Sequence, residues 1–254
     1  MDITVCIKHV PDVSAPFRVQ DGELVFDTGR HVLNAYDASA VEAALVLREE
    51  HGGTVRVVSV GPEGASETIR KALAMGADEG VHLHVEDDEQ FDAFAYATVL
   101  AAHLKDGEWD AIFCGKQSQD TDAGLTGSML AALLDLPYAT NAVGLSIDDN
   151  ASALIVERQG DLGTEVLELP PPCLVTCSND MNDPRIPKLK GIMQAKRKPL
   201  EKVAVGDLAV EAQPRTTIVG YEAMPEREPG EMLEGEPDEM VASIVQHLDE
   251  DGVL

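Results

Sequence analysis

Short apolar runs alternate with helical stretches over the first half of the chain, and this alternation limits the fold more than any other feature. The runs expected to form strands are residues 3–8, 55–60, 80–85 and 111–114. The helical stretches among them are residues 38–50, 66–75, 91–104 and 128–134. Such spacing implies right-handed βαβ crossovers and a mostly parallel sheet covered on both faces. We therefore expect a Rossmann-like α/β fold, with ligands outside the carboxyl ends of the strands.

The second half of the chain has a different pattern. After Pro137, short β runs are separated by turn residues, which predicts an antiparallel extension of the same sheet. These runs are residues 142–147, 153–157, 165–169 and 174–176. Arg158 and Asp161 flank one of the turns, where we expect a structural ion pair. A hairpin is expected at residues 17–26, because two alternating runs surround an Asp-Gly pair.

The loop between the strand at 111–114 and the helix at 128–134 is rich in glycine, hydroxyl and carboxamide groups. It consists of Gly115, Lys116, Gln117, Ser118, Gln119, Asp120, Thr121, Asp122, Ala123, Gly124, Leu125, Thr126 and Gly127. A loop in this place aims unpaired backbone N–H groups and the positive end of a helix dipole at one point, which suits a phosphate. The alternative is an ordinary turn that Thr126 or Ser128 caps.

The same loop differs from a P-loop, because no lysine follows its second glycine. Asp120 and Asp122 would repel a phosphate beside them, but they could accept bonds from ribose hydroxyls or hold the loop in shape. The loop therefore predicts a pocket for a nucleotide without indicating its chemistry.

The balance of charge limits the partners and the source. Forty-six acidic residues against nineteen basic ones give a formal charge of −27. Nucleic acid and anionic membranes are poor partners for such a field. Our hypothesis is a salt-loving organism, such as a halophilic archaeon, whose cytosolic ions screen surface carboxylates. We expect low salt to lower the melting temperature.

The remaining composition predicts a soluble cytoplasmic protein without direct membrane insertion. A strand-like run begins at residue 3, which leaves no room for a signal peptide, and no run of about eighteen apolar residues exists. Four cysteines, Cys6, Cys114, Cys173 and Cys177, fall on or beside apolar runs and are interpreted as core residues rather than metal ligands. No catalytic dyad is visible, so we expect no catalytic residues.

Residues 185–202 contain seven of the nineteen basic residues. Such a run is usually a solvated face, but scarce positive charge around Leu189, which Lys188 and Lys190 flank, suggests a docking surface for an acidic partner. The segment 222–251 is strongly acidic, with a short amphipathic helix expected at 240–248. We expect a nucleotide-binding domain at residues 1–200 and an acidic C-terminal arm at 201–254 that packs on a partner subunit.

Several stretches together resemble the electron-transfer flavoprotein β-subunit family. They are Val5-Cys6-Ile7-Lys8, Asn34-Ala35-Tyr36-Asp37, residues 67–78, the 115–127 loop, Val156-Glu157-Arg158, Asn182-Asp183-Pro184-Arg185 and Ile192-Met193-Gln194-Ala195-Lys196. The likeness covers roughly residues 1–210 in order. It implies an adenine-nucleotide-binding α/β fold and a heterodimer, in which an α subunit holds most of the FAD and the β subunit buries an AMP.

The resemblance also implies roles for individual residues. The AMP would contact Cys6, Asn34, Ala35, Tyr36, Asp37, Val60 and the loop from Gly115 to Thr126. Tyr36 would in addition pack against the flavin ring. Leu189 would anchor into partner dehydrogenases, with Lys188 and Lys190 in its polar rim.

The sequence departs from the family pattern at several positions. Ala35 and Asp37 replace the proline and cysteine of the family's Asn-Pro-Phe-Cys segment. The family's bifurcating branch, which binds a second FAD in place of AMP, also has aspartate there, but Thr121 stands where that branch has glycine. Leu162 interrupts the family signature, and Gln194 replaces a common lysine. AMP is favoured, and the second FAD stays an alternative.

The resemblance implies an electron carrier rather than an enzyme. It would take electrons from flavin dehydrogenases, of the acyl-CoA dehydrogenase type in fatty acid oxidation, and pass them to a membrane quinone reductase. One alternative is a bifurcating component with two FADs and a nicotinamide substrate. Another is a free-standing nucleotide-binding regulator that shares only the fold.

Overall fold

The structure is a computed structural model that describes residues 1–26, 29–88, 90–148, 150, 152–225, 230 and 232–253. The chain divides into two compact units, Met1–Tyr221 and Glu222–Leu254. The first unit contains the sheets and five α-helices among its described residues, and the second contains the helix α6 (Pro237–Glu250). None of the described helices combines the length and the apolar character that crossing a membrane requires.

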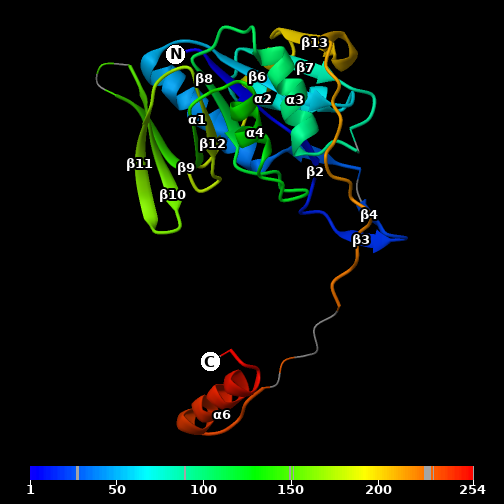
Figure 1. The fold of residues 1–254 in the computed structure, drawn as a ribbon, viewed down its shortest axis with the longest axis vertical. Helices are drawn as coiled ribbons and strands as arrows, with labels where there is room; N and C mark the ends of the chain where they lie inside the picture. The colour runs from blue at the N-terminus through cyan, green and yellow to red at the C-terminus, as the bar shows by residue number, and fades with distance from the viewer. Residues whose placement is uncertain are drawn as a thin grey trace. The chain divides into compact units, whose positions relative to one another are not determined.

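A large sheet forms the centre of the first unit (Figure 1). Among the described residues its strand order is β11-β10-β9-β12-β8-β1-β6-β7-β13. The strands of its parallel part are β1 (Ile3–Cys6), β6 (Val55–Gly61), β7 (Glu79–His84), β8 (Ala111–Gly115), β12 (Cys173–Cys177) and β13 (Leu200–Ala204). The strands β9 (Tyr138–Ile147), β10 (Leu154–Gly160) and β11 (Gly163–Leu169) extend one edge, and β10 pairs antiparallel with both β9 and β11. The expected α/β fold is confirmed.

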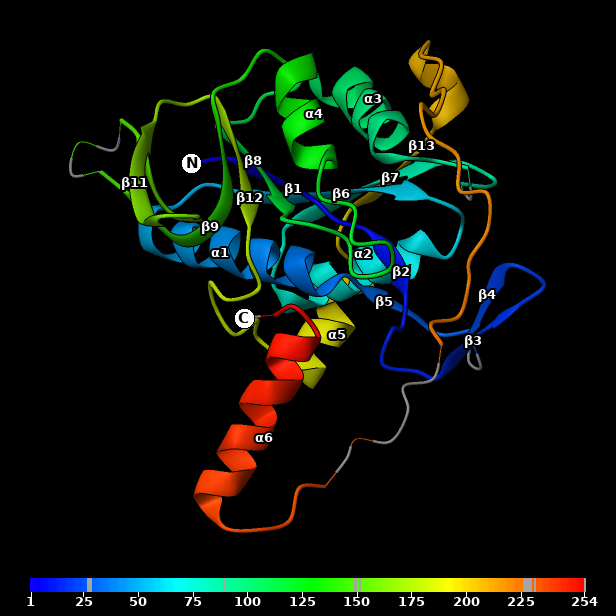
Figure 2. The same ribbon diagram turned by 60° about the horizontal axis from the view of Figure 1, so that its bottom comes forward.

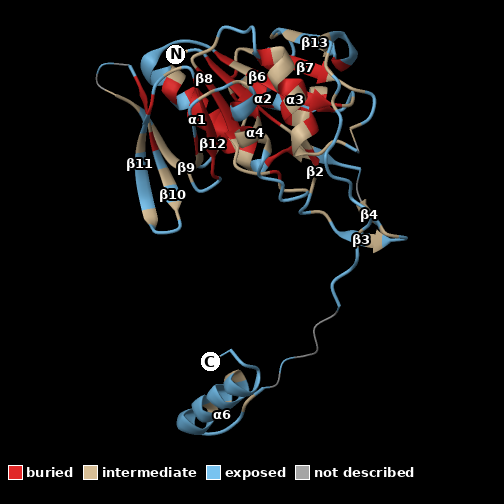
Figure 3. Ribbon diagram, in the orientation of Figure 1, coloured by how far each residue is buried: buried red, intermediate tan, exposed pale blue. Residues whose placement is uncertain are grey.

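Helices cover both faces of the sheet, as Figure 2 shows. The helices α1 (Ala35–His51) and α2 (Ala65–Met75) pack on one face, together with Val5, Val57 and Phe113. The helices α3 (Ala93–Leu104) and α4 (Thr126–Leu133) pack on the other, against residues such as Val58 and Ile112. Neighbours along a strand point to opposite faces, so strands buried on both faces must be apolar throughout. This explains the continuous apolar runs, which are buried in Figure 3.

The strand β12 corrects one expectation. We expected residues 174–176 to belong to the antiparallel extension, but β12 lies between β8 and β9 and is parallel to both. All five of its residues are buried. A short apolar run cannot by itself reveal its place in a sheet, although continuous burial is typical of a central parallel strand.

Other differences concern the edges of the first unit. The basic segment 185–202, for which we predicted neither a helix nor a strand, contains the helix α5 (Leu189–Ala195) and the start of the edge strand β13, which pairs in parallel with β7. The first strand ends at Cys6, and the chain continues through β2 (His9–Pro11), which pairs with β5 (His31–Leu33). A short 3-10 helix, η1 (Val205–Leu208), follows β13.

The predicted hairpin is confirmed as β3 (Phe17–Gln20) and β4 (Glu23–Phe26). Its two turn residues, Asp21 and Gly22, both have positive φ, as the favoured two-residue hairpin turn requires. The expected ion pair of Arg158 is wrong in its partner: Nη1 lies 3.1 Å from Oε2 of Glu165. These two residues are directly opposite in β10 and β11, whereas Asp161 lies in the turn beyond them. All four cysteines are free and buried, as predicted.

Candidate functional site

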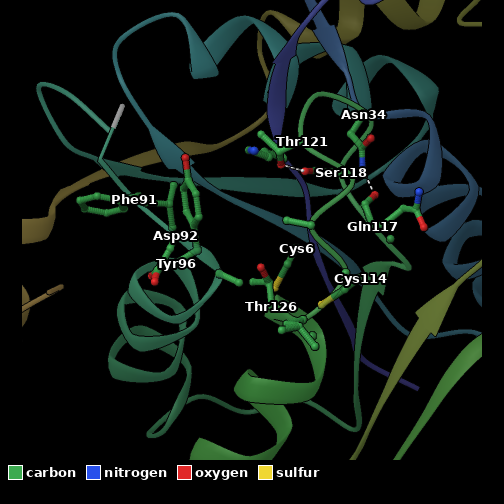
Figure 4. A pocket seen from close by; sticks show the side chains of 18 of the residues that line it. Cys6, Asn34, Phe91, Asp92, Tyr96, Cys114, Gln117, Ser118, Thr121 and Thr126 are labelled. Atoms are coloured by element: carbon green, nitrogen blue, oxygen red, sulfur yellow. Dashed lines mark hydrogen bonds between the residues drawn. The ribbon is translucent and has the colours of Figure 1, made fainter. Parts of the chain in front are cut away.

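A cavity of about 550 Å³ opens at the carboxyl ends of the parallel strands (Figure 4). The ends of β1, β6 and β8, the 115–127 loop and the first turn of α3 line it, together with residues 216–218. Its size lies within the usual range for small-molecule sites. Its place is the one that the α/β topology predicted.

Most of the predicted binding residues line this cavity. They are Cys6, Asn34, Asp37, Val60, Gly115, Lys116, Gln117, Ser118, Thr121, Asp122, Ala123, Gly124, Leu125 and Thr126. Four of the predicted residues, Ala35, Tyr36, Gln119 and Asp120, lie outside the lining. Their positions show that they support the loop or begin α1.

Asn34 and Gln119 tie the loop to the start of α1. Asn34 donates from Nδ2 to the Gln117 carbonyl at 2.9 Å and accepts the Gln119 N–H at 3.1 Å. The Ala35 N–H in turn donates to Oε1 of Gln119 at 3.1 Å. Asn34 precedes α1 but makes no side-chain cap of its own helix. The loop therefore caps α1, and α1 holds the loop.

Asp37 joins the ends of two strands from the first turn of α1. It accepts the Lys8 N–H at 2.6 Å and the Gly115 N–H at 3.0 Å. Burial raises the pKa of Asp37 to about 7, against the backbone bond from Lys8, which lowers it. Glycine is required at 115, because a Cβ there would contact Oδ1 of Asp37 and the Cβ of Tyr36.

The loop also holds its own shape. The Ser118 and Thr121 hydroxyls lie 2.9 Å apart, and the Ser118 N–H donates to the Ala123 carbonyl at 3.0 Å. Gln117 donates from Nε2 to Asp122 at 3.0 Å, and Asp122 has φ of 53°. The polar side chains of this loop thus bond largely to one another.

The helix α4 begins at Thr126 and has no side-chain cap. The cap by Thr126 or Ser128, which the alternative of an ordinary turn included, is therefore wrong. Thr126 and Gly127 line the cavity, so the first turn of α4 borders it. A Cβ at Gly127 would lie 2.5 Å from Cγ2 of Thr176, which explains how closely the helix approaches β12.

Lys8 is a cavity residue that the sequence did not reveal as one. Its Nζ lies 2.8 Å from Oδ2 of Asp120 and 5.4 Å from the centre of the Tyr96 ring. Tyr96 donates its hydroxyl to Asp88 at 2.7 Å. Burial would raise the pKa of Asp120, but the Lys8 ammonium, together with hydrogen bonds from Ser118 and the backbone, outweighs burial and lowers this pKa. Asp120 is therefore neutralised by Lys8 instead of facing a bound anion alone.

Comparison with known proteins decides the family. The electron transfer flavoprotein domain matches residues 23–208. The chain is 35% identical to electron transfer flavoprotein subunit beta of Bacillus subtilis (strain 168), over 98% of this chain and 97% of that one. The chain belongs to the electron transfer flavoprotein β-subunit family. The Mus musculus β subunit is 37% identical over 91% of each chain. Subunit CarD of the caffeyl-CoA reductase-Etf complex of Acetobacterium woodii is 36% identical over 100% of both.

Membership of the electron transfer flavoprotein family means that the chain takes part in electron transport through a flavin. No group of three or more His, Cys, Asp or Glu side chains among the described residues could hold a metal ion. The polar part of the cavity lining comes from amide and hydroxyl groups of the 115–127 loop, from carboxylates such as Asp37 and Asp122, and from Lys8.

A second surface of this electron transfer flavoprotein subunit lies on and beside α5. We call it the α5 surface: Lys188, Leu189, Lys190, Ile192 and Met193. Leu189 is 74% exposed and Met193 65% exposed. Both lysines are also exposed. The surface thus combines apolar side chains with positive charge.

The segments on both sides of α5 are fixed to the helices below. Arg185 forms ion pairs with Glu42, at 2.8 Å, and with Glu49. Hydrogen bonds to the Glu49 and Glu42 carboxylates raise the pKa of Arg185, and the bond to Glu49 contributes more. After α5, Arg70 donates to the Ala195 and Lys198 carbonyls at 2.6 and 2.8 Å. The Lys198 ammonium donates to carbonyls at the end of α2. Several bases of the segment 185–202 are therefore structural anchors.

Proposed function

We propose that the chain is the β subunit of a heterodimeric electron transfer flavoprotein and binds AMP in the cavity. The α subunit would hold most of the FAD, which supplies the electron chemistry. The observation that carries the proposal is the convergence of the turns after β1, β6 and β8 and before α1 on a single cavity.

The residues present fit an adenylate. The first turn of α4, without a side-chain cap, offers N–H groups and a positive dipole to the phosphate. Asp122, at the cavity, is the candidate to accept ribose hydroxyls. Tyr36 is half-buried outside the cavity lining and is proposed to pack on the flavin ring that the α subunit brings.

The decisive experiment is mass spectrometry of the small molecules that the purified native heterodimer releases on denaturation. We expect one AMP and one FAD per heterodimer. A colourless chain that purifies alone, without either molecule, would support the free-standing nucleotide-binding regulator and overturn the proposal.

A second candidate is a component of a bifurcating electron transfer flavoprotein with a second FAD in the cavity. The observation that favours it is the extent of the cavity, which continues from the 115–127 loop to the aromatic rings of Phe91 and Tyr96. Its likeness to CarD and the aspartate at position 37 agree with it. Two FADs per heterodimer, together with reduction by NADH, would establish this function.

We further propose that flavin dehydrogenases, of the acyl-CoA dehydrogenase type, donate electrons and dock on the α5 surface. A membrane quinone reductase would accept the electrons. The exposed Leu189 would insert into the partner, and Lys188 and Lys190 would face acidic side chains around it. Reduction of the heterodimer by a purified acyl-CoA dehydrogenase tests the donor.

The C-terminal arm is proposed to pack on the α subunit. The helix α6 has no buried residue, and Val241, Ile244 and Val245 on it are 59%, 47% and 49% exposed. An amphipathic helix with an uncovered apolar side requires a partner surface. Deleting residues 222–254 should weaken assembly with the α subunit, measured by analytical ultracentrifugation; unchanged assembly would contradict this proposal.

The net charge of −27 supports the proposal of a salt-rich cytosol. At about 1 M salt the Debye length is about 3 Å, which screens repulsion among surface carboxylates. Thermal melts at low and high salt test this, with a lower melting temperature expected at low salt.

A further inference from the structure

The segment of residues 215–221, which we call the strap, borders the cavity. Thr216, Thr217 and Ile218 contribute to the cavity lining. The strap has neither helix nor strand, and nearly all of it is exposed. A C-terminal segment far from the 115–127 loop in sequence is thus one wall of the site.

Asp92 fastens one end of the strap. Its Oδ2 accepts the N–H groups of Arg215 and Thr216, at 2.7 and 2.8 Å, and the Thr216 hydroxyl at 3.1 Å. Its other oxygen caps α3 by accepting the Ala95 N–H at 2.9 Å. The Arg215 guanidinium also lies 4.9 Å from the centre of the Phe94 ring. Asp92 therefore serves two elements with separate oxygens.

The other end of the strap is held at the hairpin, where the Tyr221 N–H donates to the Gly22 carbonyl at 2.8 Å. Within the described part of the chain, residues 217–220 form no hydrogen bond between these two attachments. Segments with few buried contacts and exposed backbone open at low free energy, unlike the core strands whose ends also line the cavity. The strap is the wall that opens most readily.

Resting on the proposed nucleotide function, we propose that the strap is the gate of the cavity, that Asp92 is its latch, and that release of the bound nucleotide requires the strap to leave Asp92. The occupant passes out between the first turn of α3 and residues 216–218. Asp92 thus acts on nucleotide retention through the strap.

The two oxygens of Asp92 allow its roles to be separated. In the Asp92→Asn variant the amide oxygen still caps α3, while the NH₂ group faces the N–H donors of the strap. The Thr216→Val variant removes only the hydroxyl contact and leaves α3 unchanged. The matched control is Asp148→Asn, because Asp148 also accepts backbone N–H groups, from Ser152 and Ala153, but does not line the cavity.

The experiment loads the intact heterodimer with radiolabelled AMP and follows its release into excess unlabelled AMP. We expect Asp92→Asn to release AMP roughly ten times faster or more, because bonds to a charged carboxylate are among the stronger ones. Thr216→Val should give a smaller increase of about threefold, because it removes only the longest of the three bonds between the strap and the Asp92 carboxylate. Asp148→Asn should release AMP at the wild-type rate.

Trypsin supplies a second readout, since it cleaves after Arg215 only when the strap leaves its place. Cleavage there should be faster in Asp92→Asn and slower with AMP bound. If the wild type retains AMP while Asp92→Asn and Thr216→Val release it at the wild-type rate, the gate is overturned and the proposed function stands. If the wild-type heterodimer retains no AMP, both are overturned. If Asp92→Asn does not fold, release from Thr216→Val decides.

Discussion

The cavity and the α5 surface use the same support in opposite ways. At the cavity, the start of α1 holds a loop inward through buried polar groups: Asn34 is 1% and Asp37 5% exposed. At the α5 surface, Glu42 of α1 and Arg70 of α2 hold a segment outward by its ends, and Leu189 between them is 74% exposed. The cavity is shaped by bonds within it, whereas the α5 surface is held by bonds at its two ends. Substitutions in the cavity should therefore lower the stability of the fold directly, whereas those near the α5 surface should lower it only at the anchors.

The largest effect is expected from Gly115→Ala. The added Cβ would lie 2.2 Å from Oδ1 of Asp37 and 2.7 Å from the Cβ of Tyr36, so the loop and α1 must separate. We expect a loss of about 3 kcal/mol in the free energy of unfolding and loss of the bound nucleotide. Urea unfolding and nucleotide content measure both. Gly29→Ala is the control, because a Cβ at Gly29 would meet nothing within 4 Å.

Arg185→Met tests the anchor beside the α5 surface. It leaves Glu42, whose side chain is 10% exposed, without its cation. Since Arg185 is itself about a third exposed, we expect a loss of roughly 2 to 3 kcal/mol, below that of a fully buried pair. Thermal melts should show this with nucleotide content unchanged. Glu49→Gln, which changes an exposed partner of Arg185, should lower the free energy of unfolding by less than about 1 kcal/mol. An equal loss in both variants would contradict the role of the Arg185–Glu42 pair as the anchor.

The pH dependence of stability tests the contribution of Asp37, a buried residue of the cavity. Its pKa is raised from 3.8 to about 7, so between these values the folded protein keeps a proton that the unfolded chain releases. Stability should therefore fall as pH rises from about 4 to about 7. The change from pH 5 to pH 7 should be about 2 kcal/mol. Asp37→Asn should remove this part of the slope in urea unfolding across that range, and an unchanged slope would show that Asp37 is not its source.

The smallest effect on stability is expected at the α5 surface itself. Leu189→Ala should change the free energy of unfolding by less than about 0.5 kcal/mol, because the side chain is exposed. It should nevertheless slow reduction by the partner dehydrogenase without loss of flavin. Stopped-flow reduction kinetics measure this, with Val166→Ala on β11 as an exposed apolar control at 65% exposure. Unchanged kinetics for Leu189→Ala would remove the docking proposal.

Local patterns predicted much of the fold. Continuous apolar runs placed the strands, the Asp-Gly pair placed the hairpin, and the loop after β8 was found from its composition. The place of β12 in the sheet could not be predicted, because strand order depends on pairing between distant segments. The edge strand β13 was not predicted, because charged residues interrupt its apolar pattern.

The same reason explains what was missed in the candidate site. Lys8 bonds to Asp120 across 112 positions, and Thr216 bonds to Asp92 across 124. Neither pair produces a local pattern of spacing. The resemblance identified the turns that converge on the cavity, but it gave no indication of the strap. Long-range polar contacts are thus where the structure adds most to the sequence.

The buried thiols have a practical consequence for spectroscopy. Burial raises the pKa of Cys173 to about 11, the pKa values of Cys114 and Cys177 are also raised, and all four thiols lie in the core. Thiolates react with maleimides, so these side chains will label slowly. A single cysteine introduced on α6 would therefore accept a dye selectively in the unaltered background. Fluorescence could then follow the arm as the two subunits of the heterodimer meet.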